Sequence, residues 1–247
     1  MPPIVTKPTA TQVRRALQGL ASPARAAGVA AFFKVGAGEY GEGDRFIGVT
    51  VPDQRRVVRQ FRAIEIDEAD VLLMSPIHEE RLTALLILVD QFNNTADPSI
   101  RKRIFQRYMR RLKFVNNWDL VDSSAEHIVG GWLFDKPREA LLSKLARSKH
   151  LWSRRVAMLA TFHFIKHGES NDALQIARML LSDSHDLIHK AVGWMLREAG
   201  KRVSVEDLRG FLQANAANMP RTTLRYAIER LSPDERARWL AVKAAKR

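Results

Sequence analysis

The chain of 247 residues contains no cysteine. This absence excludes disulfide scaffolds, thiolate zinc sites, cysteine-ligated iron–sulfur clusters and a cysteine nucleophile. Long apolar runs are also lacking, because the longest notable one, at residues 82–89, is far shorter than the roughly 20 residues of a membrane span. The N-terminus holds Pro2, Pro3 and Pro8 and no apolar signal core, which argues against secretion. We therefore expect a cytoplasmic protein without a membrane partner.

Acidic residues are scarce relative to basic ones. The 27 Asp and Glu against 40 Lys and Arg give a formal net charge of +13. A protein this basic is expected to meet a polyanion, and nucleic acid ranks ahead of a membrane surface. The charge is also local, because residues 100–114, IRKRIFQRYMRRLKF, hold seven basic side chains and no acid. For any one of these side chains, a phosphate contact and a solvated helix face are about equally good interpretations.

Strand-like alternation is rare as well. FIGVTV at residues 46–51 is the one tempting case, and it ends at Pro52. Apolar residues at three- and four-residue spacing dominate instead, with turn signals such as Asp97-Pro98 and Ser232-Pro233 between the segments. The segments expected to be helical include Glu79–Asn93, Ile100–Phe114, Asp119–Phe134, Leu151–Lys166, Leu187–Lys201 and Thr222–Leu231.

A weak repeat runs through the later helices. Arg155, Lys190 and Arg225 recur every 35 residues, in RVAML, KAVGW and RYAIE. A period of about 35–40 residues with two helices per unit is typical of HEAT- or TPR-like solenoids, and no TPR consensus is visible. We therefore predict an all-α fold, a HEAT-like helical repeat solenoid with a concave basic face. It should form a single domain over residues 1–247, with a flexible N-terminus at residues 1–9.

Residues 36–44, GAGEYGEGD, break the helical pattern. The stretch matches GxGxxG, but no strand precedes it and no P-loop lysine follows. Its three acids would also repel a pyrophosphate. We interpret it as a flexible Gly/Glu loop between two N-terminal helices and not as a nucleotide site.

Histidines offer only weak evidence for a metal site. His163 and His167 are four residues apart, as are His185 and His189, which would suit two ligands on one helix face. Neither pair encloses the glutamate of a zincin motif, and no carboxylate supplies an evident third ligand. A G-x-S-x-G nucleophile motif is absent too. We expect no metal and no cofactor, and interpret these histidines as packed or solvated.

Four side chains remain as candidates for chemistry: Trp118, Asp122, Arg155 and Trp194. Trp118 and Asp122 are four residues apart in NNWDLVD, so on a helix they share one face. Two tryptophans, a carboxylate and a guanidinium could form an aromatic cleft for a cationic group beside a phosphate clamp. Taken singly, each has a plainer interpretation: core tryptophans, and a helix-terminal Asp122 or one salt-bridged to a residue such as Arg155.

The segments NNWDLVD, LWSRRVAML and KAVGWMLREAGK, preceded by RFIGVTVPDQRR, resemble the AlkD-type DNA alkylation repair glycosylases. The resemblance covers roughly residues 20–230, with the motifs in the right order. It implies HEAT-like repeats and the excision of positively charged N3- and N7-alkylated purines from duplex DNA, without a base-specific pocket. The long loop at 36–44, absent from some members, is a departure. The residues given catalytic roles by the resemblance are Trp118, Asp122, Arg155 and Trp194. The residues that we expect to bind DNA are Arg154, Arg155, Lys190, Arg197 and Arg225.

The chemistry also follows from the residue types. Glycoside hydrolysis ordinarily needs two carboxylates. An N7-alkylguanine already carries a positive charge, so its departure needs no acid and one carboxylate, Asp122, suffices to stabilise the oxocarbenium-like sugar and orient water. Tryptophan faces favour cationic groups by ~0.5–2 kcal/mol each, and Arg155 would hold a backbone phosphate.

We therefore predict a monofunctional alkylpurine DNA glycosylase of base excision repair. It should act as a monomer on double-stranded DNA that contains alkylated bases. The alternative is a non-catalytic HEAT-repeat protein that binds damaged or distorted DNA, for which Asp122 would not be needed. A protein-interaction solenoid is a third reading, and it would present an apolar or mixed-charge concave face.

Overall fold

The computed structural model describes residues 7–242. This part of the chain is helical, and its one β-type pairing is an isolated bridge between Arg45 and Ile77. The predicted all-α class is confirmed. The chain divides into two compact units, of which unit 1 ends at Ser124 and unit 2 begins at Ala125. No helix within the described range is long and apolar enough to cross a membrane.

Most helices of unit 1 begin where the sequence supplies a cap. The side chains of Thr9, Ser22, Thr50 and Asp97 each accept a backbone N–H at a helix start. Residues 1–6 of the segment predicted to be flexible lie outside the described residues, and Thr9 forms a capping box with Gln12. The elements are α1 (Ala10–Gln18), α2 (Pro23–Phe32), α3 (Val51–Phe61), α4 (Ile66–Leu73), α5 (His78–Asn94), α6 (Pro98–Arg110), a 3-10 turn at Leu112–Phe114 and α7 (Trp118–Asp122).

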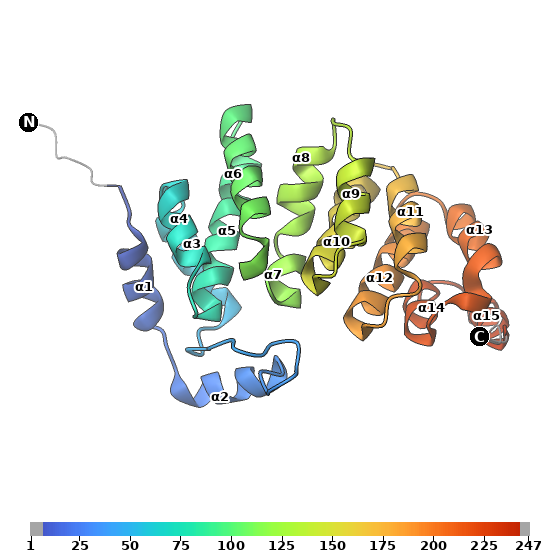
Figure 1. Cartoon of the computed structure of the whole chain (residues 1–247), viewed down its shortest axis with the longest axis horizontal. Coiled ribbons are helices and arrows are strands. Elements are labelled where there is room, and N and C mark those ends of the chain that lie inside the picture. The colour runs from blue at the N-terminus through green and yellow to red at the C-terminus, as the bar shows by residue number, and fades with distance from the viewer. Residues whose placement is uncertain (1–6, 243–247) are drawn as a thin grey trace, which may run out of the picture. The chain divides into compact units, whose positions relative to one another are not determined.

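Helix α5 is the centre of unit 1. It contacts α1, α3, α4, α6 and α7, and Leu85, Ile87 and Leu88 are completely buried along it. Helix α2 runs crosswise to α1, α3 and α5 (Figure 1), and its Phe32 is 66% exposed. The segment between α2 and α3 lies against the start of α5, where Arg45 pairs with Ile77.

Unit 2 is a stack of helix pairs (Figure 1). Helices α10, α12 and α14 pack side by side in one layer, and α9, α11 and α13 pack against them in a second. Arg155, Lys190 and Arg225 lie on α10, α12 and α14, so the 35-residue repeat and the helical repeat fold are confirmed. The elements are a π-helical turn at Glu126–Gly130, α8 (Gly131–Leu133), α9 (Glu139–Ala146), α10 (Leu151–Lys166), α11 (Asn171–Leu180), α12 (Asp186–Arg202), α13 (Val205–Asn215), a 3-10 turn at Ala216–Asn218, α14 (Arg221–Ala227) and α15 (Pro233–Ala241).

The prediction of one helix over Asp119–Phe134 is wrong. Helix α7 ends at Asp122, and a turn leads into the π-helical segment and α8. Ser124 explains the break, because its hydroxyl donates to the Leu120 carbonyl at 2.5 Å and lies 3.0 Å from the Tyr108 hydroxyl. Such local side-chain bonds compete with the helical backbone ladder.

Other predicted bounds differ less. The helix expected at Leu151–Lys166 has those bounds in the structure, whereas α14 ends at Ala227 and not at Leu231. The tempting segment at residues 46–51 forms no strand, because residues 46–50 have no regular secondary structure and Val51 begins α3. Its backbone N–H groups are taken by a side chain, because the Glu79 carboxylate accepts from residues 47, 48 and 49 at 3.1, 2.8 and 3.3 Å.

A glycine sets the spacing of two helices in unit 2. A Cβ atom on Gly193 of α12 would lie 2.5 Å from the Tyr226 Cβ and 2.6 Å from the Thr223 carbonyl oxygen of α14. Gly210 of α13 lies in the opposite situation, with no atom within 4 Å of such a Cβ. The two positions form a matched pair for testing whether α12 and α14 depend on this close approach.

We predict that Gly193→Ala lowers the free energy of unfolding by about 1–3 kcal/mol, because the added methyl forces α12 and α14 apart. Gly210→Ala should instead raise it by about 0.5–1 kcal/mol, since alanine loses less backbone entropy in a helix. Urea denaturation followed by circular dichroism measures both. An equal gain in the two variants would contradict the role of Gly193.

Candidate functional site

The four candidate residues divide between the two units. Trp118 and Asp122 are the first and last residues of α7 in unit 1, so their predicted shared helix face is confirmed. Arg155 and Trp194 lie on the neighbouring helices α10 and α12 of unit 2. Both tryptophans and Asp122 are partly exposed, whereas Arg155 is buried. The assembly of all four into one site remains a prediction.

The Trp118 ring packs at the edge of a cluster of rings. Its centroid is 5.2 Å from that of Phe33, with 17° between the planes. Phe33 stacks in turn on Phe46 at 5.2 Å, and both of these rings contact His78, Phe33 at 5.0 Å with a 41° tilt and Phe46 in a stack at 4.6 Å. Phe32 meets Trp118 edge-on at 6.0 Å. Each aromatic pair contributes about 0.5–1.5 kcal/mol beyond its buried area, so the aromatic cluster fixes the plane in which Trp118 lies.

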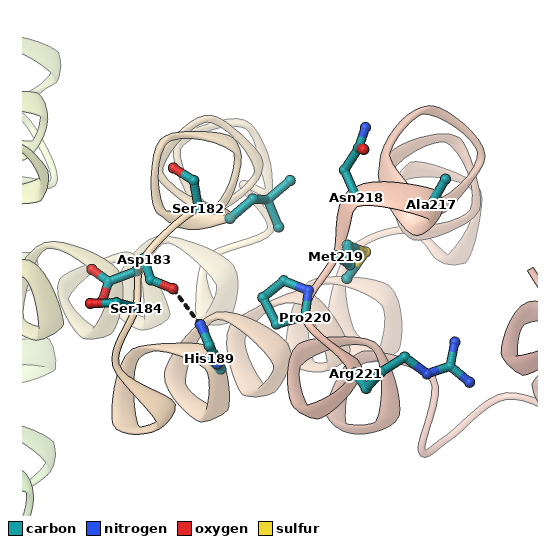
Figure 2. Close-up of a pocket in the computed structure, with 10 residues that line it drawn as sticks. Ser182, Asp183, Ser184, His189, Ala217, Asn218, Met219, Pro220 and Arg221 are labelled. Carbon is teal, nitrogen blue, oxygen red and sulfur yellow. Dashed lines mark hydrogen bonds between the residues drawn. The ribbon is translucent and has the colours of Figure 1, made fainter. Parts of the chain in front are cut away.

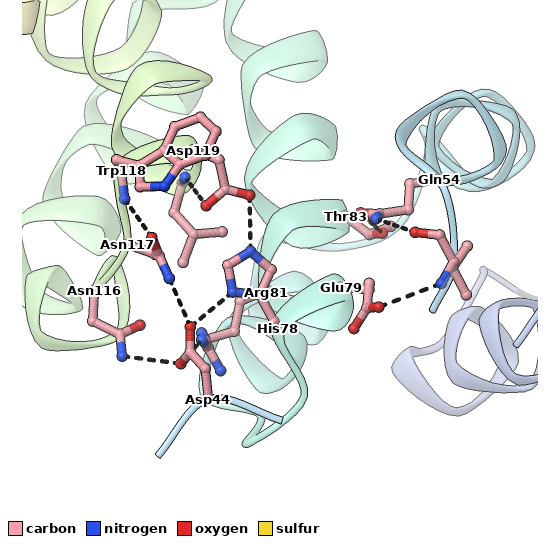
Figure 3. Close-up of polar contacts among 12 residues, drawn as sticks. Asp44, Gln54, His78, Glu79, Arg81, Thr83, Asn116, Asn117, Trp118 and Asp119 are labelled. Carbon is pink, nitrogen blue, oxygen red and sulfur yellow. Dashed lines mark hydrogen bonds and ion pairs between the residues drawn. The ribbon is translucent and has the colours of Figure 1, made fainter. Parts of the chain in front are cut away.

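The ring of His78 is held between two carboxylates (Figure 3). Its Nδ1 lies 2.9 Å from Asp44 Oδ2, and its Nε2 lies 2.8 Å from Asp119 Oδ2. An ionised carboxylate can only accept, so both ring nitrogens carry a proton and His78 is an imidazolium. Arg81 completes the set by donating from Nη2 to Asp44 Oδ1 at 2.5 Å. His78 thus links the 36–44 loop to α7 through two charge-assisted bonds.

Asp44 also binds the residues that precede α7. The side-chain amides of Asn116 and Asn117 donate to it at 3.3 and 3.1 Å. Asn117 is at the same time the N-cap of α7, because its side-chain oxygen accepts the Trp118 backbone N–H at 2.8 Å. A continuous chain of hydrogen bonds therefore runs from Asp44 to the backbone of Trp118 (Figure 3).

These contacts shift the pKa of both ionised partners. Burial alone would lower the pKa of His78, but its hydrogen bonds to Asp119 and Asp44 outweigh burial and hold that pKa above its ordinary value. Burial would raise the pKa of Asp44, but the His78 hydrogen bond and the Arg81 charge hold it below the usual range. The charged form of each group is therefore the favoured one.

Two glycine amides of the 36–44 loop, those of the GxG at its start, are used within the loop. The Glu39 carboxylate accepts from Gly36 N–H, and the Glu42 carboxylate accepts from Gly38 N–H, both at 3.0 Å. A phosphate would need these same donors. The loop lies between α2 and α3, as expected, and its last residue, Asp44, anchors it.

In unit 2, Arg155 and Trp194 both lie where α10 meets α12. The Arg155 guanidinium donates from Nη1 to the Leu187 carbonyl of α12. The Trp194 ring lies 5.8 Å from that of Phe162, and Lys166 and Arg202 lie over Phe162 at 4.6 and 5.4 Å. Trp194 thus belongs to an aromatic pair with cationic neighbours, whereas Arg155 bonds to the backbone of the adjacent helix.

The residues expected to bind DNA differ in how far they are already paired. Arg154 donates from Nε to Asp183 at 2.5 Å, and Arg197 pairs with Glu198 at 3.1 Å and with Glu229. Lys190 pairs with Asp186 one turn away at 2.7 Å, and Arg225 is exposed. Arg154 and Arg197 therefore help to join successive helices, a role that the sequence did not indicate.

The basic stretch at residues 100–114 is partly structural. Arg107 and Arg111 bind the buried Asp70 of α4 at 2.5 and 2.7 Å, and Arg101 donates to the Phe92 carbonyl at 3.1 Å. The exposed members of the stretch include Lys102, Arg110 and Lys113. The sequence analysis allowed a phosphate contact or a solvated helix face, whereas Arg101, Arg107 and Arg111 bond to groups of the protein itself.

The rings of His163 and His167 stack on each other at 4.4 Å, and the Phe134 ring lies 5.4 Å from His163 and 4.5 Å from His167. Burial lowers the pKa of His163 to about 4, so this ring is neutral at physiological pH. Between residues 7 and 242, no three side chains of the metal-binding types gather as ligands would. The packed interpretation of this pair agrees with these contacts.

A pocket of about 640 Å³ lies in unit 2 between the loop at 181–184 and the segment 217–221 (Figure 2). His189 lines it and donates from Nε2 to the Asp183 carbonyl at 2.5 Å. The Asp183 carboxylate is taken by Arg154. Arg155 and Trp194 do not line this pocket, so it adds nothing to the candidate site.

The sequence analysis missed Asp44, His78 and Asp119. Asp119 lies inside the quoted motif NNWDLVD, and His78 opens the run His-Glu-Glu-Arg at the start of an otherwise apolar helix. Charged residues at the start of an otherwise apolar helix are the signal that could have indicated buried charges with bonding partners. The local sequence does not indicate which residues those partners are.

The comparisons with known proteins agree with this fold. A family model described as DNA alkylation repair enzyme matches residues 13–231. No curated protein matches the chain significantly. The solved structure of a predicted DNA alkylation repair enzyme from Enterococcus faecalis is similar, with a TM-score of 0.66 and 15% identity. The alignment covers 86% of this chain and 97% of that one, and at this identity it shows a shared fold.

The raised pKa of His78 predicts that stability falls at alkaline pH. A group with a raised folded-state pKa contributes stability that is complete below the unfolded value of about 6.5 and lost as the pH rises through the folded value. The free energy of unfolding, measured by urea denaturation from pH 6 to 9, should therefore decline in the wild type and much less in His78→Gln. Histidines with lowered pKa values are neutral in both states over most of this window and add little slope: His127, His150, His163 and His185. Parallel curves for the two proteins would contradict the imidazolium assignment.

Proposed function

The chain belongs to the DNA alkylation repair enzyme family, and from this premise we propose that it is a monofunctional DNA glycosylase. Its proposed substrates are cationic N3- and N7-alkylated purines in double-stranded DNA, whose N-glycosidic bond it hydrolyses. The proposed active species is a monomer, and the reaction opens base excision repair.

One observation carries this proposal. Helix α7 presents an aromatic ring and a carboxylate, Trp118 and Asp122, one turn apart and both partly exposed. The ring is held by its stack on Phe33, and the helix is held by the Asp44 and His78 bonds. A preorganised carboxylate beside an aromatic face suits a reaction in which positive charge moves from a base to a sugar.

The chemistry requires one carboxylate. As the bond to the alkylated base breaks, its electron pair neutralises the cationic base, and positive charge develops on the sugar. Asp122 would stabilise that charge and orient the water that adds to the sugar carbon. Trp118 and Trp194 would favour the cationic nucleotide through their faces, and Arg155 would hold a neighbouring phosphate.

We predict that the wild-type protein releases base from a duplex containing N7-methylguanine. It should release none from a duplex containing uracil, because the proposed mechanism has no acid to activate a neutral leaving group. Asp122→Asn should slow single-turnover release by about 100-fold or more, with DNA affinity nearly unchanged. Chromatography of the released base measures both rates. Asp135→Asn, at an exposed carboxylate outside α7, is the matched control and should react at the wild-type rate.

Release by Asp122→Asn at the wild-type rate would remove this carboxylate from the mechanism, and efficient uracil excision would overturn the substrate class. DNA binding without base release by the wild type would favour the non-catalytic binding protein instead.

The proposed DNA contacts predict a salt-dependent affinity. Arg225→Ala and Lys190→Ala should each weaken binding, and each should reduce the slope of log K against log salt concentration by about 0.9. Fluorescence anisotropy with a labelled duplex between low and moderate salt measures the slope. Arg230→Ala, at another exposed arginine of unit 2 outside the 35-residue series, provides a comparison. Unchanged slopes in the first two variants would mean that the repeated basic positions are only solvated.

A further inference from the structure

Helix α7 is too short to hold its own position. It has five residues, whereas isolated helices below about 12–15 residues are marginal in water. The placement of Trp118 and Asp122 must therefore come from contacts with the rest of unit 1. Apart from the burial of Leu120 and Val121, the contacts that carry the argument are the packing of the Trp118 ring on Phe33 and the hydrogen bonds at the start of the helix.

We infer that His78 is a positioning residue of this site: by joining Asp44 of the 36–44 loop to Asp119 of α7, it holds Trp118 and Asp122 in the geometry that the reaction needs. The inference rests on the proposed function. His78 takes no part in bond breaking and acts only through α7.

The polar contacts make His78 the hub of this arrangement. Asp119 directly follows Trp118 and lies one turn before Asp122, so the bond from His78 Nε2 at 2.8 Å acts on the same turn that carries both candidates. The other ring nitrogen binds Asp44, which reaches Trp118 a second time through the Asn117 cap. Loss of His78 would weaken both connections.

The aromatic contacts reach the same ring by an independent path. The His78 ring contacts both Phe46 at 4.6 Å and Phe33 at 5.0 Å, and Phe33 stacks on Trp118. The imidazole is thus part of the aromatic cluster that supports Trp118 as well as the bridge between the carboxylates. His78 therefore reaches Trp118 both through ring packing and through hydrogen bonds. A salt bridge with only a structural role would need only the hydrogen bonds.

Charge balance explains why the ring must be an imidazolium. Asp44, His78 and Arg81 are all less than 5% exposed at their side chains, and Asp119 is 14% exposed. The two carboxylates and two cations cancel only when His78 is protonated, and an unpaired buried charge is strongly destabilising. The remaining charged groups at this end of α5 have other partners: Glu79 accepts the backbone N–H groups of residues 47–49, and Glu80 pairs with Arg14 of α1 at 2.9 Å.

The geometric requirement gives the inference a measurable consequence. A displacement of about 1 Å in a reacting group can cost about 100-fold in rate without affecting ground-state binding. Removing His78 should therefore lower the chemical rate far more than the DNA affinity. A role in general stability alone would leave the rate of the folded protein unchanged.

The test compares single-turnover release of N7-methylguanine and the Kd for the same duplex. His78→Gln offers one amide group and cannot bracket both carboxylates, so we expect its rate to fall about 10- to 100-fold with little change in Kd. Asp119→Ala leaves the buried ring in place and should show the same loss if His78→Gln fails to fold. Asp119→Asn keeps an acceptor oxygen for Nε2–H and should restore most of the rate.

Gln54→Met is the matched control. Gln54 is 2% exposed, donates to the Val49 carbonyl at 3.0 Å and accepts from Thr83 at 3.3 Å, and none of these bonds reaches α7 (Figure 3). The substitution removes buried hydrogen bonds in the same unit, so it should lower stability while the rate of base release stays at the wild-type value.

Amide hydrogen exchange of the peptide that contains α7 supplies a readout that needs no substrate. Exchange should rise in His78→Gln and Asp119→Ala and stay at the wild-type level in Asp119→Asn and Gln54→Met. Wild-type rates and exchange in the first two variants overturn the inference and leave the proposed function intact. Absence of base release by the wild type would overturn the proposed function instead, and unchanged exchange would then overturn the positioning role by itself.

Discussion

The burial of the Asp44 carboxylate is the constraint on which unit 1 depends. Taking a carboxylate out of water costs several kcal/mol unless good partners compensate. Here those partners come from two places, His78 and Arg81 at the start of α5 and Asn116 and Asn117 just before α7. Satisfying one buried charge therefore brings the end of the 36–44 loop, the start of α5 and the start of α7 together, and the candidate residues of α7 inherit that placement.

Unit 2 uses charge differently. Arg138 binds Asp172 at 2.9 Å and Arg154 binds Asp183 at 2.5 Å, so carboxylates of one helix pair hold arginines of the preceding one. These contacts occupy part of the chain's basic excess. The net charge of +13 therefore overstates the number of cations offered to a nucleic acid, and exposed residues such as Arg225 matter more than the total.

Prediction from sequence succeeded where the information is local. The spacing of apolar residues gave α10 its bounds, and the recurrence of a basic residue every 35 positions found the helices that pack side by side in unit 2. It failed at Asp119–Phe134, where Ser124 bonds to Leu120 and Tyr108 and ends the helix. A tertiary contact to Tyr108, 16 residues away, does not appear in a helical periodicity.

The sequence by itself determined that the protein is helical, that it repeats, and that Trp118 and Asp122 share one face, because helical geometry fixes which neighbours align. Only the tertiary structure decided what holds that face. His78 meets Asp44 across 34 residues and Asp119 across 41, and a histidine in a sequence carries no mark of its partners. Its charge, its raised pKa and its position against Phe33 and Phe46 all arise from packing, which brings two carboxylates to the same buried ring.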